Sequence, residues 1–340
     1  MTPEPPVRVT LTGVRSLTHL VYAASFLRHL LTERAGPVQV GVYDLGDGFG
    51  RSRVSADDVL ALLPDDPSLT IDPDLSGGGR VADHFTVVAD RSRVLLSVGA
   101  PGLRVWRRMV RAGRGHRPRV VVLDEGIGSF GDLRTRLAAY RRQGGSGPWP
   151  VVRAAAVSGG NRVLTDERWS LYRRDGGRWV VDERVAREFR DRVQGEPAAP
   201  GTAVYLGQPW PELGVMTERD YLDHLHVVAE ACDAAGLALV VRPHPSEDPG
   251  RYAGLARSSS GVPAELDRAA VTARVVIGSH STALLNLAAV HGVPAVRVTA
   301  PGLSGLDRAL GSRQRALFDT FLPLAADPEG LRSALGRALG

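Results

Sequence analysis

The chain has 340 residues, of which 43% are hydrophobic and 23% are charged, with a net charge of +5. This composition is typical of a globular protein large enough for two domains. All 42 basic residues are arginines, which excludes a Schiff-base or other lysine-dependent mechanism. A single cysteine, Cys232, excludes an intramolecular disulfide. Apolar runs stay near strand length and the N-terminus is polar and rich in proline, so we expect a cytoplasmic protein without a signal peptide.

The first half of the chain alternates strands with helices. Val7–Thr12 predicts the first strand, followed by a turn at Gly13 and a long helix that ends near Leu31. Buried-type strands are also predicted at residues 38–44, 94–98 and 119–124. This alternation predicts a parallel sheet with helices on both faces. The Gly13 turn can let the backbone approach a ligand or can be a plain strand–helix turn, and no G-x-G-x-x-G pattern predicts a dinucleotide site.

A second α/β half follows a linker. The region of residues 151–181 is interpreted as short strands around Gly159-Gly160 and Gly176-Gly177. The composition of residues 194–201 is that of a linker, so we place the domains at residues 1–197 and 198–340. Strands are predicted at residues 203–206, 238–242, 275–277 and 295–298, and helices at residues 217–235, 283–291 and 328–339. We expect the last helix to pack back on the first domain, and a ligand cleft between the two halves.

Three groups of polar residues follow predicted strands, where open α/β sheets place their ligands. The first is Asp124-Glu125-Gly126. A carboxylate that is partly removed from water has a raised pKa and can accept a proton from a hydroxyl group. The alternative is an acidic turn that caps the next helix, and the two interpretations weigh equally here.

The second group is His244, held between Pro243 and Pro245 on a stiff strand exit. A protonated histidine there is a charged donor to a phosphate. The third is the pair Ser281-Thr282 at a helix start, where hydroxyl and backbone N–H groups bind phosphate but where an ordinary helix cap is equally expected. Arg242 is interpreted first as a structural residue and second as a ligand contact.

Other chemistries have less support. No His-x-x-x-His or cysteine pair predicts a metal site. A hydrolase triad of Ser281, His244 and Asp124 lacks the G-x-S-x-G elbow. No basic helix is interleaved with aromatic residues, so a nucleic-acid partner is not expected.

In their order along the chain, Asp124-Glu125-Gly126, His244-Pro245 and Ser281-Thr282 resemble the motifs of bacterial sialyltransferases, above all the capsule polysialyltransferase-like group. Two further pieces fit this resemblance, namely Gly207-Gln208-Pro209 and Val262-Pro263-Ala264-Glu265. The resemblance covers roughly residues 5–300. It implies a GT-B fold, in which two Rossmann-like domains face each other across a central cleft.

The resemblance also implies roles for these residues. The family uses a CMP-activated nonulosonic sugar, inverts the anomeric centre and needs no metal or other cofactor. By resemblance, Asp124 is the general base and His244 stabilises the departing CMP phosphate. Ser281 and Thr282 match the phosphate-binding pair of the family, and Glu265 resembles its ribose or cytosine contact. Pro245 and Gly278 are further candidates for binding the donor nucleotide. Secondary site candidates are Glu125, Gly126, Arg242, Gly13 and Gln208.

We therefore expect a sialyltransferase-like enzyme that transfers sialic acid or a related acid to a glycan or other hydroxyl acceptor. The alternatives are a GT-B transferase that uses a UDP- or GDP-sugar, a non-catalytic nucleotide- or carbohydrate-binding protein, and a hydrolase or epimerase. The basic stretch Arg104–Arg119 offers a peripheral contact with the inner face of a membrane. The sequence does not specify the acceptor, the nonulosonic acid or the oligomeric state.

Overall fold

The structure, a computed structural model, describes residues 6–34, 36–43, 45, 54–75, 84–85, 93–124, 126–142, 146–300, 303, 310–323 and 325–340. The chain forms two compact units. Residues Met1–Ser129, Ala139–Arg173 and Asp182–Glu188 make the first, and residues Phe130–Ala138, Arg174–Val181 and Phe189–Gly340 make the second. This division differs from the predicted domain limits of 1–197 and 198–340, which stay a prediction. The cleft between the two halves also stays a prediction.

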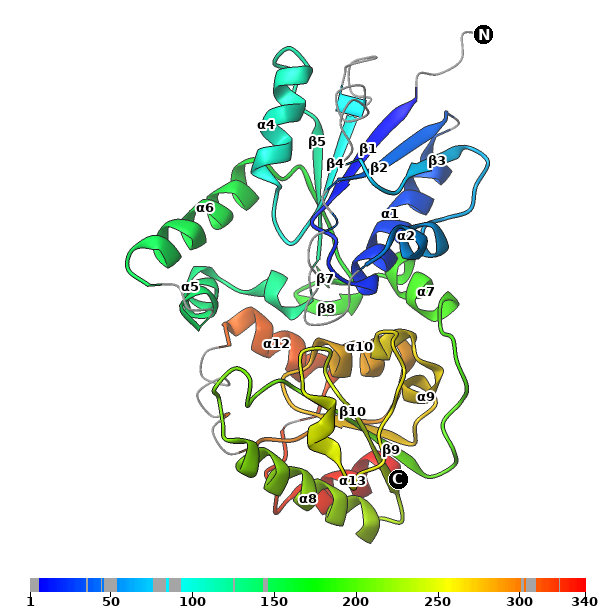
Figure 1. Cartoon of the computed structure of the whole chain (residues 1–340), viewed down its shortest axis with the longest axis vertical. Coiled ribbons are helices and arrows are strands. Elements are labelled where there is room, and N and C mark those ends of the chain that lie inside the picture. Colours follow the sequence, from blue (N-terminus) through cyan, green and yellow to red (C-terminus); the bar gives the residue numbers. More distant parts are fainter. Residues whose placement is uncertain are drawn as a thin grey trace. The chain divides into compact units, whose positions relative to one another are not determined.

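The first unit is built on a six-stranded parallel sheet with the strand order β3-β2-β1-β4-β5-β6 (Figure 1). Its strands are rich in valine and leucine because most of them are covered on both faces. The order reverses between β1 and β4, which in open sheets is the switch point beside which ligands bind. The strands are β1 (Val7–Thr12), β2 (Val38–Tyr43), β3 (Leu69–Asp72), β4 (Arg93–Val98), β5 (Arg119–Leu123) and β6 (Glu167–Trp169).

The other elements up to residue 191 also depend on local interactions; of these, β8 and most of α5 belong to the second unit. Ser55 caps α2 by accepting a hydrogen bond from Asp58 N, and Asp58 reaches back to Ser55 N. The elements are α1 (Leu17–Glu33), α2 (Ala56–Leu62), α4 (Leu103–Ala112), the 3₁₀ turn η1 (Ile127–Phe130), α5 (Leu133–Arg142), α6 (Trp149–Val163), β7 (Tyr172–Asp175), β8 (Arg178–Val181) and α7 (Glu183–Asp191).

The short strands predicted around Gly159-Gly160 are wrong, because these glycines lie inside α6. Pro150 sits in the first turn of this helix, where its missing N–H costs nothing, and Ala154–Ala156 favour the helical state that two glycines weaken. The prediction is confirmed at Gly176-Gly177, which connect β7 to β8. The edge strand β3 was not predicted, because its sequence is short and only half-buried.

The second unit has a four-stranded parallel sheet with the order β10-β9-β11-β12. Its switch point lies between β9 and β11, since the chain passes from β10 on one side to β11 on the other. The remaining elements are β9 (Thr202–Leu206), α8 (Glu218–Ala234), β10 (Ala238–Arg242), η2 (Pro249–Tyr252), η3 (Ala264–Leu266), α9 (Arg268–Val271), β11 (Val275–Gly278), α10 (Thr282–His291), β12 (Ala295–Arg297), α12 (Ser312–Phe321) and α13 (Leu331–Leu339).

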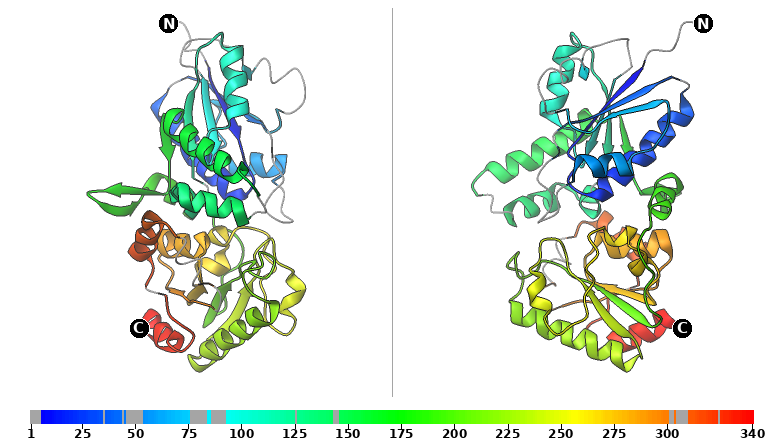
Figure 2. Two further views of the ribbon diagram at one scale, coloured as in Figure 1. Left: turned by 90° about the vertical axis from the view of Figure 1, so that its left-hand side faces the viewer. Right: turned by 45° about the vertical axis from the view of Figure 1, so that its right-hand side comes forward.

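The core of the second unit joins α8 and α13 to one face of this sheet (Figures 1 and 2). Cys232 is buried in it, and Thr217 caps α8 by accepting a hydrogen bond from Asp220 N at 3.1 Å. Leu331 and Leu335 of α13 are fully buried in the same core. The apolar side of α13 is thus taken up by the core of its own unit, and packing of the last helix on the first domain stays a prediction. No helix among the described residues is long and apolar enough to cross a membrane.

Candidate functional site

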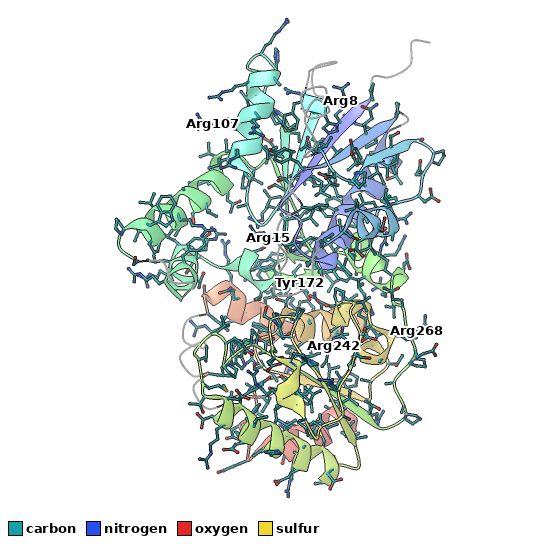
Figure 3. All side chains as sticks on the ribbon, in the orientation of Figure 1. Arg8, Arg15, Arg107, Tyr172, Arg242 and Arg268 are labelled. Carbon is teal, nitrogen blue, oxygen red and sulfur yellow. The ribbon has the colours of Figure 1, made fainter. Side chains whose placement is uncertain are left out.

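At the switch point of the first unit, the chain leaves β1 through the turn at Gly13. Gly13 has a φ of +81°, and the N–H of Arg15 donates to Nδ1 of the buried His19 at 3.1 Å. Burial, together with the nearby Arg15 charge, lowers the pKa of His19 to about 4, so the ring is neutral at pH 7 and free to accept this bond. Arg15 lies at the carboxyl edge of the sheet, and Arg8 lies near its other edge (Figure 3). The turn is thus rigid, but no contact shows whether Gly13 approaches a ligand.

Asp124 follows β5 at the same edge. Its side chain is only 1% exposed, and its backbone N–H donates to Trp169 O at 3.2 Å. Ser170 Oγ hydrogen-bonds to Asp124 Oδ2, and Arg168 Nη2 lies 3.5 Å from Oδ1. Asp124 is thus buried and does not lie on the surface. A buried carboxyl group is held among a hydroxyl and a guanidinium.

The proton count around Ser170 bears on the ionisation of Asp124. Ser170 Oγ is also 2.8 Å from Tyr172 O, but a hydroxyl group has only one proton to donate. Both contacts are satisfied at once when Asp124 is protonated and donates to Ser170, which donates to Tyr172 O. Burial raises the pKa of Asp124 to about 6, although Ser170 and Arg168 act in the opposite direction. A carboxyl group with this pKa can take up a proton and return it near neutral pH.

Gly126 has a φ of +90°, a backbone conformation that L side chains rarely adopt, which accounts for a glycine at this position. Glu125 lies outside the described residues.

In the second unit, several of the predicted residues meet at one edge of the sheet. The exits of β10, β9 and β11 are adjacent because Arg242 pairs with Leu206 and Ile277 pairs with Tyr205. These exits carry His244, Gln208 and Ser281 respectively. Asp124 belongs to the other unit, and its placement beside these three residues stays a prediction.

The hydrogen bonds of His244 fix the form of its ring. The N–H of Ser246 donates to His244 Nδ1 at 3.1 Å, so Nδ1 is an acceptor and the ring proton lies on Nε2. Burial lowers the pKa of His244, and the nearby Glu212 opposes this only in part. The expectation of a protonated histidine is therefore corrected: near neutral pH the ring is neutral and offers one donor, Nε2–H.

The sequence analysis missed the residue that holds this loop. Glu247 Oε2 accepts a hydrogen bond from the N–H of His244 at 2.6 Å, and the N–H of Glu247 donates to His244 O at 2.9 Å. Glu247 Oε1 accepts from Tyr252 Oη at 2.6 Å, which lies 3.2 Å from Tyr221 Oη. Tyr221 Oη in turn accepts from the N–H of Gln208 at 3.1 Å. Glu247 and Tyr221 thus tie the exits of β10 and β9 to one buried network.

The glycine at position 207 makes room for this network. A Cβ there would overlap Glu247 Oε2 and would lie 3.1 Å from Tyr252 Oη. Burial raises the pKa of Glu247, while its hydrogen bonds from Tyr252 and from the N–H of His244 lower it. The three-residue spacing from His244 to Glu247 was the available sequence signal, since it matches the reciprocal bonds of a capping box.

Arg242 and Glu265 have structural partners. Arg242 forms a buried ion pair with Asp267 and donates to Val262 O, contacts that favour its structural interpretation. Asp267 also accepts from Ala269 N at 3.1 Å and so starts α9. Glu265 Oε1 accepts from Asn286 Nδ2 at 2.9 Å, and burial raises the pKa of this carboxyl group. Neither side chain is free for a ligand without exchanging these bonds.

The start of α10 lies beside the switch point. Ser281 Oγ accepts from Leu284 N at 3.4 Å, so Ser281 caps the helix, and its own hydroxyl proton is still available to a ligand. Ser279 Oγ is buried and makes no hydrogen bond within the described part of the chain. Thr282 occupies the first helical position. Gly278 ends β11 with ordinary van der Waals distances around it, and Pro245 is exposed.

Within the described residues, no group of three or more His, Cys, Asp or Glu side chains is placed to hold a metal ion. The edge of the second sheet offers three kinds of hydrogen-bond donor, namely the imidazole N–H of His244, the hydroxyl group of Ser281 and the N-terminus of α10. This set of neutral donors suits a phosphate group.

Residues 185–300 match the family model of alpha-2,8-polysialyltransferase (POLYST), which confirms the resemblance for that part of the chain. No curated protein sequence matches the chain.

Solved structures show the fold. An α/β-galactoside α-2,3-sialyltransferase from Photobacterium phosphoreum has a TM-score of 0.55 at 10% identity, over 96% of this chain and 99% of that chain. A UDP-N-acetylglucosamine 2-epimerase has a TM-score of 0.57 at 10% identity, over 99% and 88%. The glycosyltransferase of kitacinnamycin has a TM-score of 0.51 at 13% identity, over 99% and 92%. The chain thus has a GT-B fold of two Rossmann-like units, and its match to the polysialyltransferase family over residues 185–300 supports a glycosyltransferase.

Proposed function

We propose that the protein transfers sialic acid or a related nonulosonic acid from a CMP-activated donor to a hydroxyl group of a glycan or other acceptor. The observation that carries this proposal is the edge of the second sheet. His244, Ser281 and the start of α10 offer phosphate donors there, inside the part of the chain that matches the family.

In this proposal, the acceptor oxygen attacks the anomeric carbon of the donor in a single inverting displacement. The bond from that carbon to the phosphate oxygen breaks, and CMP leaves with the electron pair. Asp124 takes the proton of the acceptor hydroxyl group, which a carboxyl group with a pKa of about 6 can do once it is ionised. A positioned base of this kind contributes about 10²–10⁴-fold to the rate.

On the donor side, the neutral His244 donates Nε2–H to the leaving phosphate. Ser281 Oγ–H and the backbone N–H groups at the start of α10 are expected to share its negative charge. No metal ion has a role in this proposal.

The test begins with calorimetric titration of CMP, UDP and GDP in the presence of EDTA. Binding of CMP alone supports the proposal, whereas preferential binding of UDP or GDP overturns the donor. Asp124→Ala is then expected to abolish transfer and to leave CMP affinity nearly unchanged, while His244→Ala weakens both. If Asp124→Ala keeps more than about a tenth of the rate, the assignment of the base is wrong.

Product analysis separates the remaining alternatives. A transferase consumes the nucleotide sugar in step with the acceptor and forms a glycoside of inverted configuration. Consumption of the donor without an acceptor, with release of free sugar or an epimer, would instead indicate a hydrolase or an epimerase.

A further inference from the structure

The positive charge of the chain is concentrated in one stretch of the sequence, most of which lies in the first unit. Residues 101–163 contain thirteen arginines and three acidic residues, a local charge of +10 in a chain whose net charge is +5. The rest of the chain is therefore net acidic. Such a concentration creates a field that attracts an extended anionic surface.

Helix α4 carries the first part of this charge on its outer side. Val105 and Met109 are buried against the sheet, whereas Arg104, Arg107 and Arg111 are exposed. No acidic side chain among the described residues pairs with these three arginines. Figure 3 labels Arg107 on the side of α4 that faces away from the sheet.

Helix α6 adds exposed apolar side chains and further arginines. Trp149 is 64% exposed, Val152 is 51% exposed and Val163 is 70% exposed. Only Pro150 and Ala154 of this helix are buried, and its charged residues are both arginines. The side of α6 that carries this tryptophan and these valines is therefore exposed to water and is not covered by other parts of the first unit.

The two helices adjoin. A Cβ at Gly160, near the end of α6, would lie 4.0 Å from the side chain of Leu103, the first residue of α4 and itself exposed. Figures 1 and 2 show α6 leading away from this end of α4 on one side of the first unit. The arginines of α4 and the apolar side chains of α6 thus belong to neighbouring parts of one surface.

We propose that α4 and α6 form a docking surface for an anionic lipid bilayer. Arginine side chains extend to the phosphate level while tryptophan and valine enter the boundary between head groups and acyl chains. The arginines alone would suit any polyanion, such as an acidic polysaccharide. The exposed Val152 and Val163 gain nothing from a hydrated polyanion but do gain from a bilayer, and they decide the choice between the two.

The proposal goes beyond the proposed transfer reaction, so it can be tested without any assay of activity. The full chain is floated with vesicles of phosphatidylcholine alone or with 30% phosphatidylglycerol, at low and high salt. We expect binding to the anionic vesicles only, and weaker binding at high salt.

Two variants of the surface separate its charged and apolar parts. Arg104→Gln, Arg107→Gln and Arg111→Gln together should lower the partition coefficient by about 100-fold, since each arginine near an anionic surface contributes about 5-fold. Trp149→Ala with Val152→Ser should weaken vesicle binding about 10-fold or more and leave binding to dextran sulfate unchanged.

The matched control replaces Arg313, Arg332 and Arg337 of the second unit by glutamine, which changes the charge by the same amount. CMP affinity and the melting temperature show that every variant is folded. Equal binding by the α4 variant and the control variant would overturn the proposal. So would retention on dextran sulfate without any flotation, which would assign the surface to a soluble polyanion.

Discussion

The buried network around Glu247 gives a prediction that can be worked through bond by bond. Its four donors are the N–H groups of His244 and Gln208 and the hydroxyl groups of Tyr221 and Tyr252. Its four acceptors are the two oxygens of Glu247 and the two phenolic oxygens. Each donor has its own acceptor when the Glu247 carboxyl group is ionised, and Arg251 Nη1, which lies 3.6 Å from Glu247 Oε1, favours that state.

Glu247→Ala removes two acceptors and therefore leaves two buried donors without a partner. An unsatisfied buried polar group costs about 1–3 kcal/mol, so this variant should lower the free energy of unfolding by about 2–6 kcal/mol. Glu247→Gln keeps one acceptor and adds donors. If the Gln amide donates to Tyr252 and Tyr252 donates to Tyr221, one hydroxyl proton of Tyr221 is left over, which costs about 1–3 kcal/mol.

Denaturant unfolding at pH 7 measures both losses. Glu230→Gln is the control, because it makes the same change of side chain at an exposed position of α8 in the same unit. It should cost about 1 kcal/mol or less. CMP affinity measured on folded protein should fall in the order control, Gln, Ala, because the N–H of His244 loses its anchor. A cost below about 1 kcal/mol for Glu247→Ala, or a larger cost for Gln than for Ala, would refute this account of the network.

Further predictions concern the ionisable groups. The rate of transfer should rise with pH through about 6 as Asp124 ionises, and Asp124→Asn should abolish this rise together with the activity. The stability effect has the opposite sign. Because the pKa of Asp124 is raised above 3.8, its contribution to the free energy of unfolding is full below pH 3.8 and is lost as pH rises through about 6, by about 3 kcal/mol. Unfolding curves at several pH values should show this loss in the wild type and not in Asp124→Asn. Arg242→Ala leaves the buried Asp267 unpaired and should destabilise the protein by about 3–5 kcal/mol, whereas mutation of both residues to apolar side chains should cost less; a double-mutant cycle measures the difference. His244→Gln should keep part of the CMP affinity that His244→Ala loses, because an amide N–H can replace Nε2–H; equal titration curves for the two variants would contradict the role of this donor.

Local sequence was sufficient where a single interaction decides the structure. Val7–Thr12 and Arg119–Leu123 are strands because runs of β-branched and leucine residues need cover on both faces. Thr217 starts α8 because its hydroxyl group is within reach of the third following N–H. Such features depend on residues a few positions apart, and the motifs at Asp124, His244 and Ser281 could be placed at strand ends for the same reason.

What only the tertiary structure decided depends on residues far apart in the chain. The ionisation of Asp124 depends first on its burial, which the spacing of residues in the sequence does not predict. It depends also on Arg168 and Ser170, which are more than forty positions away in the chain. The neutral state of His244 follows from burial of its ring by the surrounding protein. Tyr221 joins the hydrogen-bond network of Glu247 from α8, which precedes the His244 loop in the chain. The sequence by itself determined which side chains stand at the strand exits. Their protonation and their partners were decided by the fold, because desolvation and hydrogen bonding depend on every group that packs around a residue and not only on its neighbours in the chain.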